Sequence, residues 1–281
     1  MKGKLYIVAT PIGNLEDITL RALKTLKEVD VIACEDTRVT RKLLSKYDIE
    51  KPLVSYHEHN EQQKARELIS LLESGKNIAV VSDSGTPGIS DPGYRIVTLA
   101  SQKGIEVIPV PGPCAAIAAL SVSGLPTARF AFFGFLPKSA KKRKEFLESI
   151  REYPETLVFY ESPNRILETL KDIIEVLGDR NISISRELTK VFEESLKGKA
   201  SCVLETLRQR QSIKGEITVV VEGKHHEETD LGQEVERELK ECREKGLSLK
   251  EAVQTVSKEL GISKNLVYRK ALTVWQKQSR A

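Results

Sequence analysis

The chain opens with Leu5-Tyr6-Ile7-Val8-Ala9, a short apolar run, and continues into Thr10-Pro11-Ile12-Gly13-Asn14. Proline, glycine and asparagine are typical of a tight loop, so the first run predicts a strand that ends there. Apolar residues then recur at Ile18, Ala22 and Leu26, with the spacing of one helix face. The opening of the chain therefore predicts the order strand, loop, helix.

Similar units recur before residue 124, with apolar runs at residues 29–34, 78–81 and 107–110. Strands that alternate with helices and consist of continuous apolar residues are typical of a parallel sheet covered on both faces. Gly124-Leu125-Pro126 interrupts this order. A second series of apolar runs follows at residues 130–135, 157–160, 182–185 and 217–221. We therefore predict an α/β protein with two domains, residues 1–123 and 124–224.

Residues 225–281 have the composition of a charged helical segment without a strand candidate. Ser248 and Ser263 can each cap a helix, and Gly261 between them can turn the chain. The apolar residues around that glycine have the spacing of a helix-turn-helix, although Lys270 stands where the motif usually has an apolar residue. This small C-terminal helical appendage is either a packing hairpin or a module that contacts RNA.

The composition is that of a globular protein: of 281 residues, 40% are hydrophobic and 30% charged, which excludes wholesale disorder. The apolar runs fall well short of the ~18 residues that a membrane span needs. Four cysteines, Cys34, Cys114, Cys202 and Cys242, lie far apart without a C-x-x-C pair. We therefore expect a cytoplasmic protein with free thiols, no metal site and no membrane partner.

The net charge is only +4, but basic residues gather in two segments. The first segment contains Lys138, Lys141, Lys142, Arg143 and Lys144. In the second, residues 257–281, six basic side chains stand against one acidic residue. Phosphate groups attract such segments electrostatically, so both are candidate RNA contacts; a solvated helix face explains either one alone equally well.

Three loops that follow predicted strands are candidates for a binding site, because ligands of parallel α/β sheets gather at the carboxyl ends of the strands. They comprise residues 10–14, 82–93 and 111–116, and all three combine proline with glycine. Proline fixes the shape of a loop, and glycine lets its backbone approach a ligand closely. The chain has no P-loop motif, no G-x-S-x-G and no G-x-G-x-x-G in the first loop. This excludes a P-loop NTPase and disfavours a standard dinucleotide-binding domain or a hydrolase.

The chain resembles the tetrapyrrole methylase superfamily in long motifs at residues 8–19, 35–38, 57–61, 82–93 and 110–113. The resemblance continues through residues 133–138, 159–165 and 185–190 and covers essentially the whole chain. It implies the class III methyltransferase fold, with S-adenosylmethionine as methyl donor in a cleft between two α/β domains. It also suggests a homodimer.

Two loops place the resemblance in the rRNA branch of this superfamily. Many corrin and haem-pathway members carry a glycine-rich first loop and a Gly-Asp-Pro turn, whereas this chain has Thr10-Pro11-Ile12-Gly13 and Gly85-Thr86-Pro87. The branch implies 2'-O-methylation of a cytidine in small-subunit (16S) ribosomal RNA, either free or in the assembled small ribosomal subunit. The alternatives are a small-molecule methylase of the tetrapyrrole type and a non-enzymatic helix-turn-helix protein that binds nucleic acid.

The matching motifs also imply which residues line the donor site, in loops of both domains. In the first domain these are Pro11, Ile12, Gly85, Thr86, Pro87, Gly88, Ile89, Pro113, Cys114 and Ala115. In the second domain they are Glu161, Ser162, Glu216 and Ile217.

A ribose hydroxyl is a poor nucleophile near neutral pH, so a carboxylate within hydrogen-bond reach would help by taking its proton. Glu35 and Asp36 are the first candidates for a catalytic base, because they directly follow an apolar strand. They also stand beside Arg38 and Arg41, which could bind the flanking phosphates. The alternative for Glu35 and Asp36 is a helix cap with local ion pairs. Further candidate bases are Asp83, Asp91, Glu161 and Glu187.

His57 and His59 flank Glu58 and precede Asn60. No further His or Cys cluster in the sequence completes a metal site around them. RNA contact by His57, His59 and Asn60, through stacking and hydrogen bonds to base edges, suits these residue types. The alternative is a surface loop in which Asn60 and Glu61 begin a helix.

Overall fold

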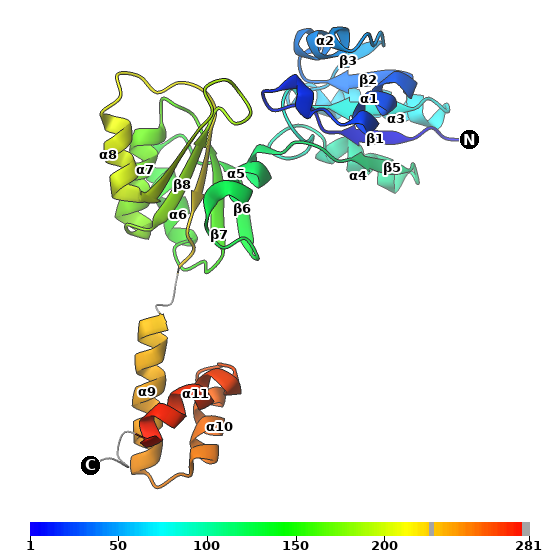
Figure 1. Cartoon of the computed structure of the whole chain (residues 1–281). Helices are drawn as coiled ribbons and strands as arrows, with labels where there is room; N and C mark the ends of the chain where they lie inside the picture. The colour runs from blue at the N-terminus through cyan, green and yellow to red at the C-terminus, as the bar shows by residue number, and fades with distance from the viewer. Residues whose placement is uncertain (225–227, 277–281) are drawn as a thin grey trace. The chain divides into compact units, whose positions relative to one another are not determined.

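The computed structural model describes residues 1–224 and 228–276, and it divides the chain into two compact units, residues 1–223 and 224–281 (Figure 1). The first unit contains two β-sheets. The division into three domains, with boundaries after residues 123 and 224, stays a prediction. No helix in the described ranges has the length and apolar character that crossing a membrane requires.

The first sheet consists of β1 (Leu5–Val8), β2 (Val31–Cys34), β3 (Leu53–Ser55), β4 (Ile78–Val81) and β5 (Val107–Val110). Neighbouring strands are all parallel, in the order β3-β2-β4-β1-β5, so the predicted parallel sheet is confirmed. The sequence pattern does not predict β3, because its three residues are only partly buried at the edge of the sheet.

Helices cover both faces of the first sheet. They are α1 (Leu20–Glu28), α2 (Thr37–Lys46), α3 (Glu61–Glu73) and α4 (Tyr94–Gln102), and a short 3-10 helix, Leu15–Asp17, precedes α1. Alternate side chains of a strand point to opposite faces. Val8 of β1 packs in one core with Leu26 of α1, whereas Leu5 packs in a second core with Leu68 of α3. Burial on both faces explains why the strands are continuous apolar runs.

The second sheet consists of β6 (Phe130–Phe135), β7 (Thr156–Glu161), β8 (Asn181–Arg186), β9 (Glu194–Lys199) and β10 (Ile217–Val221). Their order is β6-β7-β10-β8-β9, and this sheet is mixed: β6 and β7 are parallel, whereas the other pairs are antiparallel. The sequence pattern does not predict β9, whose exposed and half-buried positions alternate along a mostly polar strand at the sheet edge.

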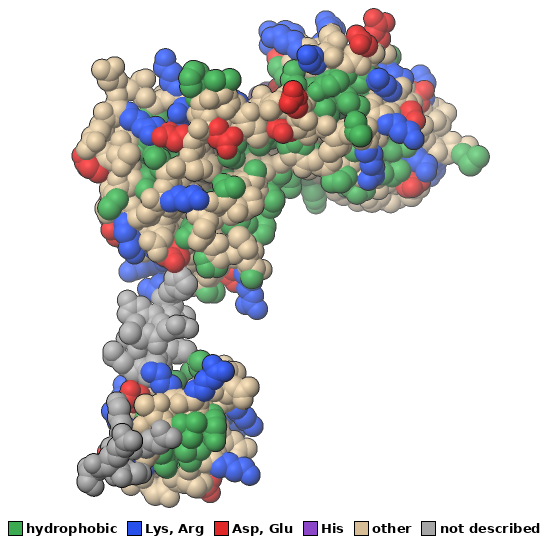
Figure 2. Space-filling view, in the orientation of Figure 1, with side chains coloured by type: hydrophobic (Ala, Val, Ile, Leu, Met, Phe, Trp, Pro, Cys, Tyr) green, Lys and Arg blue, Asp and Glu red, His purple; other side chains and the backbone are tan. Residues whose placement is uncertain are grey.

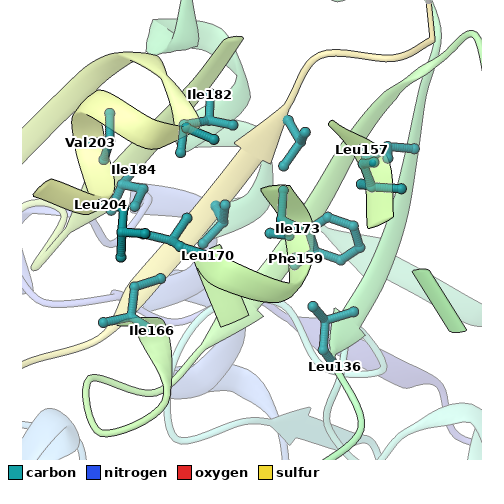
Figure 3. Close-up of a cluster of buried hydrophobic side chains, with 14 of the residues drawn as sticks. Leu136, Leu157, Phe159, Ile166, Leu170, Ile173, Ile182, Ile184, Val203 and Leu204 are labelled. Carbon is teal, nitrogen blue, oxygen red and sulfur yellow. The ribbon is translucent and has the colours of Figure 1, made fainter. Parts of the chain in front are cut away.

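One face of the second sheet carries the larger core, which Figure 3 shows in close-up. Side chains of α6 (Ala140–Ser149), α7 (Ile166–Leu177) and α8 (Ala200–Arg208) pack there against the strands, with Phe159 and Leu170 among the fully buried residues. The opposite face is covered by α5 (Ala115–Ser123), whose Ala119 and Leu120 pack against Val158 and Val220. The chain crosses from the first sheet to the second through α5.

The second unit is a small helical body with α9 (Glu228–Glu244), α10 (Leu249–Glu259) and α11 (Lys264–Gln276). Ser248 caps α10 as predicted: its hydroxyl accepts from the backbone N–H of Glu251, whose carboxylate accepts in return from the backbone N–H of Ser248. Gly261 turns the chain with a φ of +65°. The three helices share a core of their own, centred on Leu239, Val256 and Val267.

Candidate functional site

A pocket of about 320 Å³ opens in the first unit, where loops at the carboxyl ends of the first sheet meet the ends of strands in the second. The first sheet contributes Ile12, Ser84, Gly85, Thr86, Ile89, Ser90, Asp91, Cys114 and Ala115. The second contributes Phe135, Tyr160, Glu161, Ser162, Pro163, Ser185, Leu188, Gly215, Glu216, Ile217 and Thr218. The residues expected at a donor site are thus brought together, except for Pro11, Pro87, Gly88 and Pro113.

A backbone bridge holds the first two loops of the pocket together. The N–H of Thr10 donates to the carbonyl of Gly85 at 2.9 Å, and the N–H of Gly85 donates back at 3.1 Å. The Thr10 hydroxyl donates to the carbonyl of Ser82 at 3.0 Å. Gly85 has a φ of +86°, and a Cβ there would lie 3.3 Å from Cγ2 of Ile12. Both its conformation and its surroundings therefore favour glycine.

The four expected residues outside the pocket wall have other roles in the structure. Pro87 is buried, and Pro11 lines a smaller neighbouring hollow. The carbonyl of Pro113 accepts from the Thr86 hydroxyl at 3.0 Å, which ties two pocket loops together. A Cβ at Gly88 would meet nothing within 4 Å. Glycine is therefore favoured at this position by the positive φ of +84°, and not by a close approach of another part of the backbone.

Glu161 is a buried carboxylate at the end of β7 whose oxygens are fully engaged. One oxygen accepts from the Thr169 hydroxyl at 2.6 Å and lies 3.2 Å from the Arg165 guanidinium. The other accepts from the backbone N–H of Ser162 at 2.7 Å. Arg165 in turn donates to the carbonyl of Leu136 at 2.7 Å. Glu161 therefore shapes the pocket wall, and its carboxylate is not free to act as a base.

An ion-pair network lies at the neighbouring strand of the pocket wall, next to Glu216. The Lys190 ammonium lies 2.8 Å from Glu187 and 3.1 Å from Glu216. The hydrogen bonds that Glu187 accepts from Lys190 and from the backbone N–H of Glu216 hold the pKa of Glu187 below its usual range. A carboxyl with a lowered pKa does not suit the role of proton acceptor. The first loop is fastened to this network, because the backbone N–H of Asn14 donates to the Thr189 hydroxyl at 3.0 Å.

Glu35, Asp83 and Asp91 interact electrostatically beside the pocket. Burial, and then the neighbouring charges of Asp91 and Asp83, raise the pKa of Glu35 to about 7. Burial also raises the pKa of Asp91 to about 6; a hydrogen bond from Ser82 opposes this shift, and the charge of Asp83 adds to it. Asp91 lines the pocket itself. Carboxyls whose pKa values lie near neutrality are suited to accept a proton.

Asp36 differs from Glu35 although the two are adjacent. It is the N-cap of α2, where its carboxylate accepts from the backbone N–H of Arg38 at 2.8 Å, and it forms an ion pair with the Arg38 guanidinium at 2.7 Å. Hydrogen bonds from Arg38 lower the pKa of Asp36 to about 2. The structure thus gives Asp36 the capping arrangement that was the alternative to a catalytic role.

The segment from His57 to Asn60 forms the turn before α3. Asn60 accepts from the backbone N–H of His57 at 2.9 Å and donates to the carbonyl of Ser55 at 3.1 Å, so its amide closes the turn. His59 is exposed, and its ring lies 6.0 Å from that of His57. Within the described ranges, no group of three or more His, Cys, Asp or Glu side chains is placed to hold a metal ion.

The basic cluster of α6 is only partly available to a ligand. Lys138, Lys141 and Lys142 are exposed. Arg143 is buried, with its guanidinium 2.6 Å from Asp172, and the ammonium of Lys144 lies 2.7 Å from Glu175. The interpretation of Arg143 as an RNA contact is therefore wrong, because its charge is neutralised inside the protein.

Sequence reasoning missed several aromatic and polar residues of the pocket wall, above all Tyr160. Its hydroxyl accepts from the backbone N–H of Ala116 at 3.3 Å, and its ring packs edge-on against Phe132 and Phe135. Burial raises the pKa of Tyr160, so the hydroxyl stays neutral. The sequence signal for Tyr160 is an aromatic pair, Phe135 and Tyr160, at the ends of two consecutive predicted strands.

Comparisons with known proteins find a matching family, similar sequences and a similar fold. Residues 4–203 match the family described as "Tetrapyrrole (Corrin/Porphyrin) Methylases". The chain is 47% identical to "Ribosomal RNA small subunit methyltransferase I" of Halalkalibacterium halodurans, over 95% of this chain and 94% of that protein. It is 52% identical to the protein of the same name from Thermotoga maritima, over 79% of this chain and 99% of that protein.

A solved structure, that of uroporphyrin-III C-methyltransferase from Thermus thermophilus complexed with S-adenosyl homocysteine, has the same fold. It superposes with a TM-score of 0.54 at 21% identity and covers 79% of this chain and 98% of its own. The match of the family to most of the chain and the identity to its relatives confirm the resemblance carried by the loops. The chain belongs to the tetrapyrrole (corrin/porphyrin) methylase family.

Proposed function

We propose that this protein transfers a methyl group from S-adenosylmethionine to the 2'-hydroxyl of a cytidine in small-subunit (16S) ribosomal RNA. The observation that carries the proposal is the similarity of the chain, at 45–52% identity over 79–97% of its length, to proteins named for methylation of this RNA. The pocket supplies a site for the donor, and the carboxylates beside it supply candidates for the base.

S-adenosylmethionine is the methyl donor, and the pocket residues fit it. A volume of about 320 Å³ lies at the lower end for small-molecule sites, which combine apolar walls with a few placed polar groups. Ile12, Ile89 and Leu188 offer apolar surface, and Ser84 and Ser162 offer polar groups. The donor's sulfonium makes its methyl group open to in-line displacement, and no metal is required. The task of the chain is to hold the two reactants close and aligned.

We place the proton acceptor among the carboxylates beside the pocket, with Glu35 and Asp91 ahead of Asp36. A carboxyl with a pKa near 6 or 7 is ionised over part of the neutral range and is still basic enough to accept a proton as the ribose oxygen attacks. Asp36 is already committed to Arg38 and to the first turn of α2. It acts in this account as a positioning residue for the helix that follows.

RNA contacts are proposed for exposed basic side chains, for the exposed His59 and for the half-buried His57. Lys138, Lys141 and Lys142 are the phosphate contacts at α6, and Arg38, Arg41, His57 and His59 are the candidates beside the first sheet. The amide of Asn60 supports the turn that presents the two histidines. Lys144 keeps part of its exposure and adds to the positive potential.

Removing the exposed charges of α6 tests that assignment. In the variant Lys138→Ala/Lys141→Ala/Lys142→Ala we expect weaker RNA binding and a salt dependence flatter by about two units of slope, since each neutralised phosphate contributes roughly 0.7 to 0.9. Donor affinity should stay the same. Lys2→Ala/Lys76→Ala/Lys103→Ala, which removes three exposed lysines at the amino-terminal edge of the first sheet, is the matched control. If both variants showed the same salt slope of RNA affinity, the lysines at α6 would be ordinary solvated side chains and not RNA contacts.

We also propose a homodimer and a cytoplasmic location, where ribosomal RNA is found. Exposed apolar side chains gather on α5, with Ile117 and Val122, and in the loop before β9, with Val191 and Phe192. The Lys197 ammonium of β9 donates to the carbonyl of Val122, which links α5 to the strand that follows this loop. Exposed apolar surface of this kind marks an interaction site. Light scattering should give twice the chain's 31.4 kDa.

The experiment that tests the function offers three substrates in parallel. Methyl-labelled donor is added to the protein with assembled small subunits, with free small-subunit RNA and with porphyrin precursors. Label in either RNA sample supports the proposal, and comparison of the two shows which form is the substrate. Label in the porphyrin sample alone would favour a small-molecule methylase, and RNA binding without transfer would favour a non-enzymatic binding protein.

A further inference from the structure

The second unit presents the outer face of α11 without a protein partner among the described residues of this unit. Val267, Ala271 and Val274 turn inward and are buried against α9 and α10. The positions on the opposite side, at helical spacings of three and four, are Asn265, Tyr268, Arg269 and Leu272, and all of them are exposed. Tyr268 and Leu272 keep 47% and 36% of their surface in solvent.

The exposed surface of α10 and α11 is also basic. Lys258 near the end of α10 and Lys264, Arg269 and Lys270 on α11 carry no ion pair in the part of the chain that the structure describes, and Glu259 is the one acidic residue between positions 252 and 276. By contrast, Lys240 and Lys245 of α9 are paired with Glu236 and Glu241. Figure 2 shows apolar side chains at the surface of this unit with Lys and Arg side chains around them.

This combination is poorly explained by a solvated helix face. A purely solvated face has no use for an exposed tyrosine and two exposed leucines, Leu266 and Leu272. Unpaired cations beside an aromatic ring are, however, what single-stranded or looped RNA binds: phosphates attract the charges, and an unstacked base can stack on the ring. The helix-turn-helix arrangement of α10 and α11 presents such a face on a rigid support.

The comparisons separate this unit from the catalytic body. The Thermotoga maritima relative is matched over 99% of its own length but covers only 79% of this chain, about the share that residues 1–223 make up. This relative, which has the same name as the Halalkalibacterium halodurans protein, thus lacks a stretch about as long as the second unit. The unit is accordingly an addition to a body that is complete without it.

We propose that the outer face of α11 binds an unpaired segment of the substrate RNA, with Lys264 and Arg269 on phosphates and Tyr268, one turn after Lys264, stacked on a base. This inference rests on the proposed function for the identity of the RNA. Its consequence is that the second unit raises the affinity of the enzyme for RNA and leaves the methyl-transfer step unchanged.

The test uses the full chain with Lys264→Ala/Arg269→Ala and, separately, Tyr268→Ala, with Tyr268→Phe as the conservative variant that keeps the ring. Lys240→Ala/Lys245→Ala is the control, because it removes two exposed charges from the same unit. Affinity for free small-subunit RNA is measured over a range of salt concentrations. The single-turnover methylation rate is measured with RNA at saturation.

We expect Lys264→Ala/Arg269→Ala to weaken RNA binding about tenfold and to lower the salt slope by roughly 1.4 to 1.8. Tyr268→Ala should weaken binding at least fivefold, and Tyr268→Phe should restore it. The saturated rate should not change. If the affinities of these variants for RNA equalled that of the control variant, the proposal would be overturned. If wild type bound RNA through α11 but transferred no methyl group, the proposed function would fail while this binding face remained.

Discussion

Ala115→Trp is expected to lower the affinity for S-adenosylmethionine at least a hundredfold and to abolish methyl transfer. Ala115 is the first residue of α5 and lines the pocket, where its small side chain leaves space for a ligand. An indole at this position would occupy a large share of the 320 Å³. Because the residue is only half-buried, the bulk can enter the pocket without displacing the core, and the fold should persist.

Ser70→Trp is the matched control for that result, since it places the same side chain at an exposed position of α3 that does not line the pocket. Calorimetry with the donor and a thermal melt are to be recorded for both variants. We expect wild-type melting for both and wild-type donor affinity for Ser70→Trp alone. Unchanged donor affinity in a folded Ala115→Trp would show that the donor binds elsewhere.

The carboxylates beside the pocket give the second large effect. Glu35→Gln or Asp91→Asn should lower the single-turnover rate roughly a hundredfold, the lower end of what general base catalysis contributes, with little change in donor or RNA affinity. A base must be ionised to accept a proton. The wild-type rate should therefore rise with pH through the interval from about 6 to 7, where the pKa values of Asp91 and Glu35 lie, and level off above it.

Asp36→Asn separates catalysis from capping at the neighbouring position. Its carboxylate caps α2 and pairs with Arg38, so the amide variant should melt earlier and methylate at nearly the wild-type rate. A large fall in rate for Asp36→Asn with wild-type melting would restore Asp36 as the base. Wild-type rates for all three amide variants would mean that none of these carboxylates takes the proton.

Much of the architecture could be predicted because burial on both faces leaves a plain record in the sequence. Runs such as residues 78–81 and 217–221 are continuous apolar segments, and each is a central, buried strand in the structure. Edge strands leave a weaker record, since one side of the strand meets solvent. For that reason β3 and β9 were not predicted, and with β9 the mixed character of the second sheet was missed.

In the candidate site, too, features that depend on nearby sequence could be predicted, and features that depend on distant residues could not. Loop residues such as Gly85 and Thr86 could be placed because proline and glycine mark the loop itself. The burial of Arg143 could not, because its partner Asp172 stands on another helix, 29 residues away. Likewise, the raised pKa of Glu35 depends on Asp83 and Asp91, which the fold brings near from a different loop.

The product of the proposed reaction is a cytidine whose ribose is methylated on its 2'-oxygen. After reaction with methyl-labelled donor, the small-subunit RNA is digested to nucleosides, which are separated and identified by mass spectrometry. We expect the label in 2'-O-methylcytidine, at a single position of the RNA, and no label with Ala115→Trp. Label on the base of a nucleoside, or on several ribose types, would contradict it.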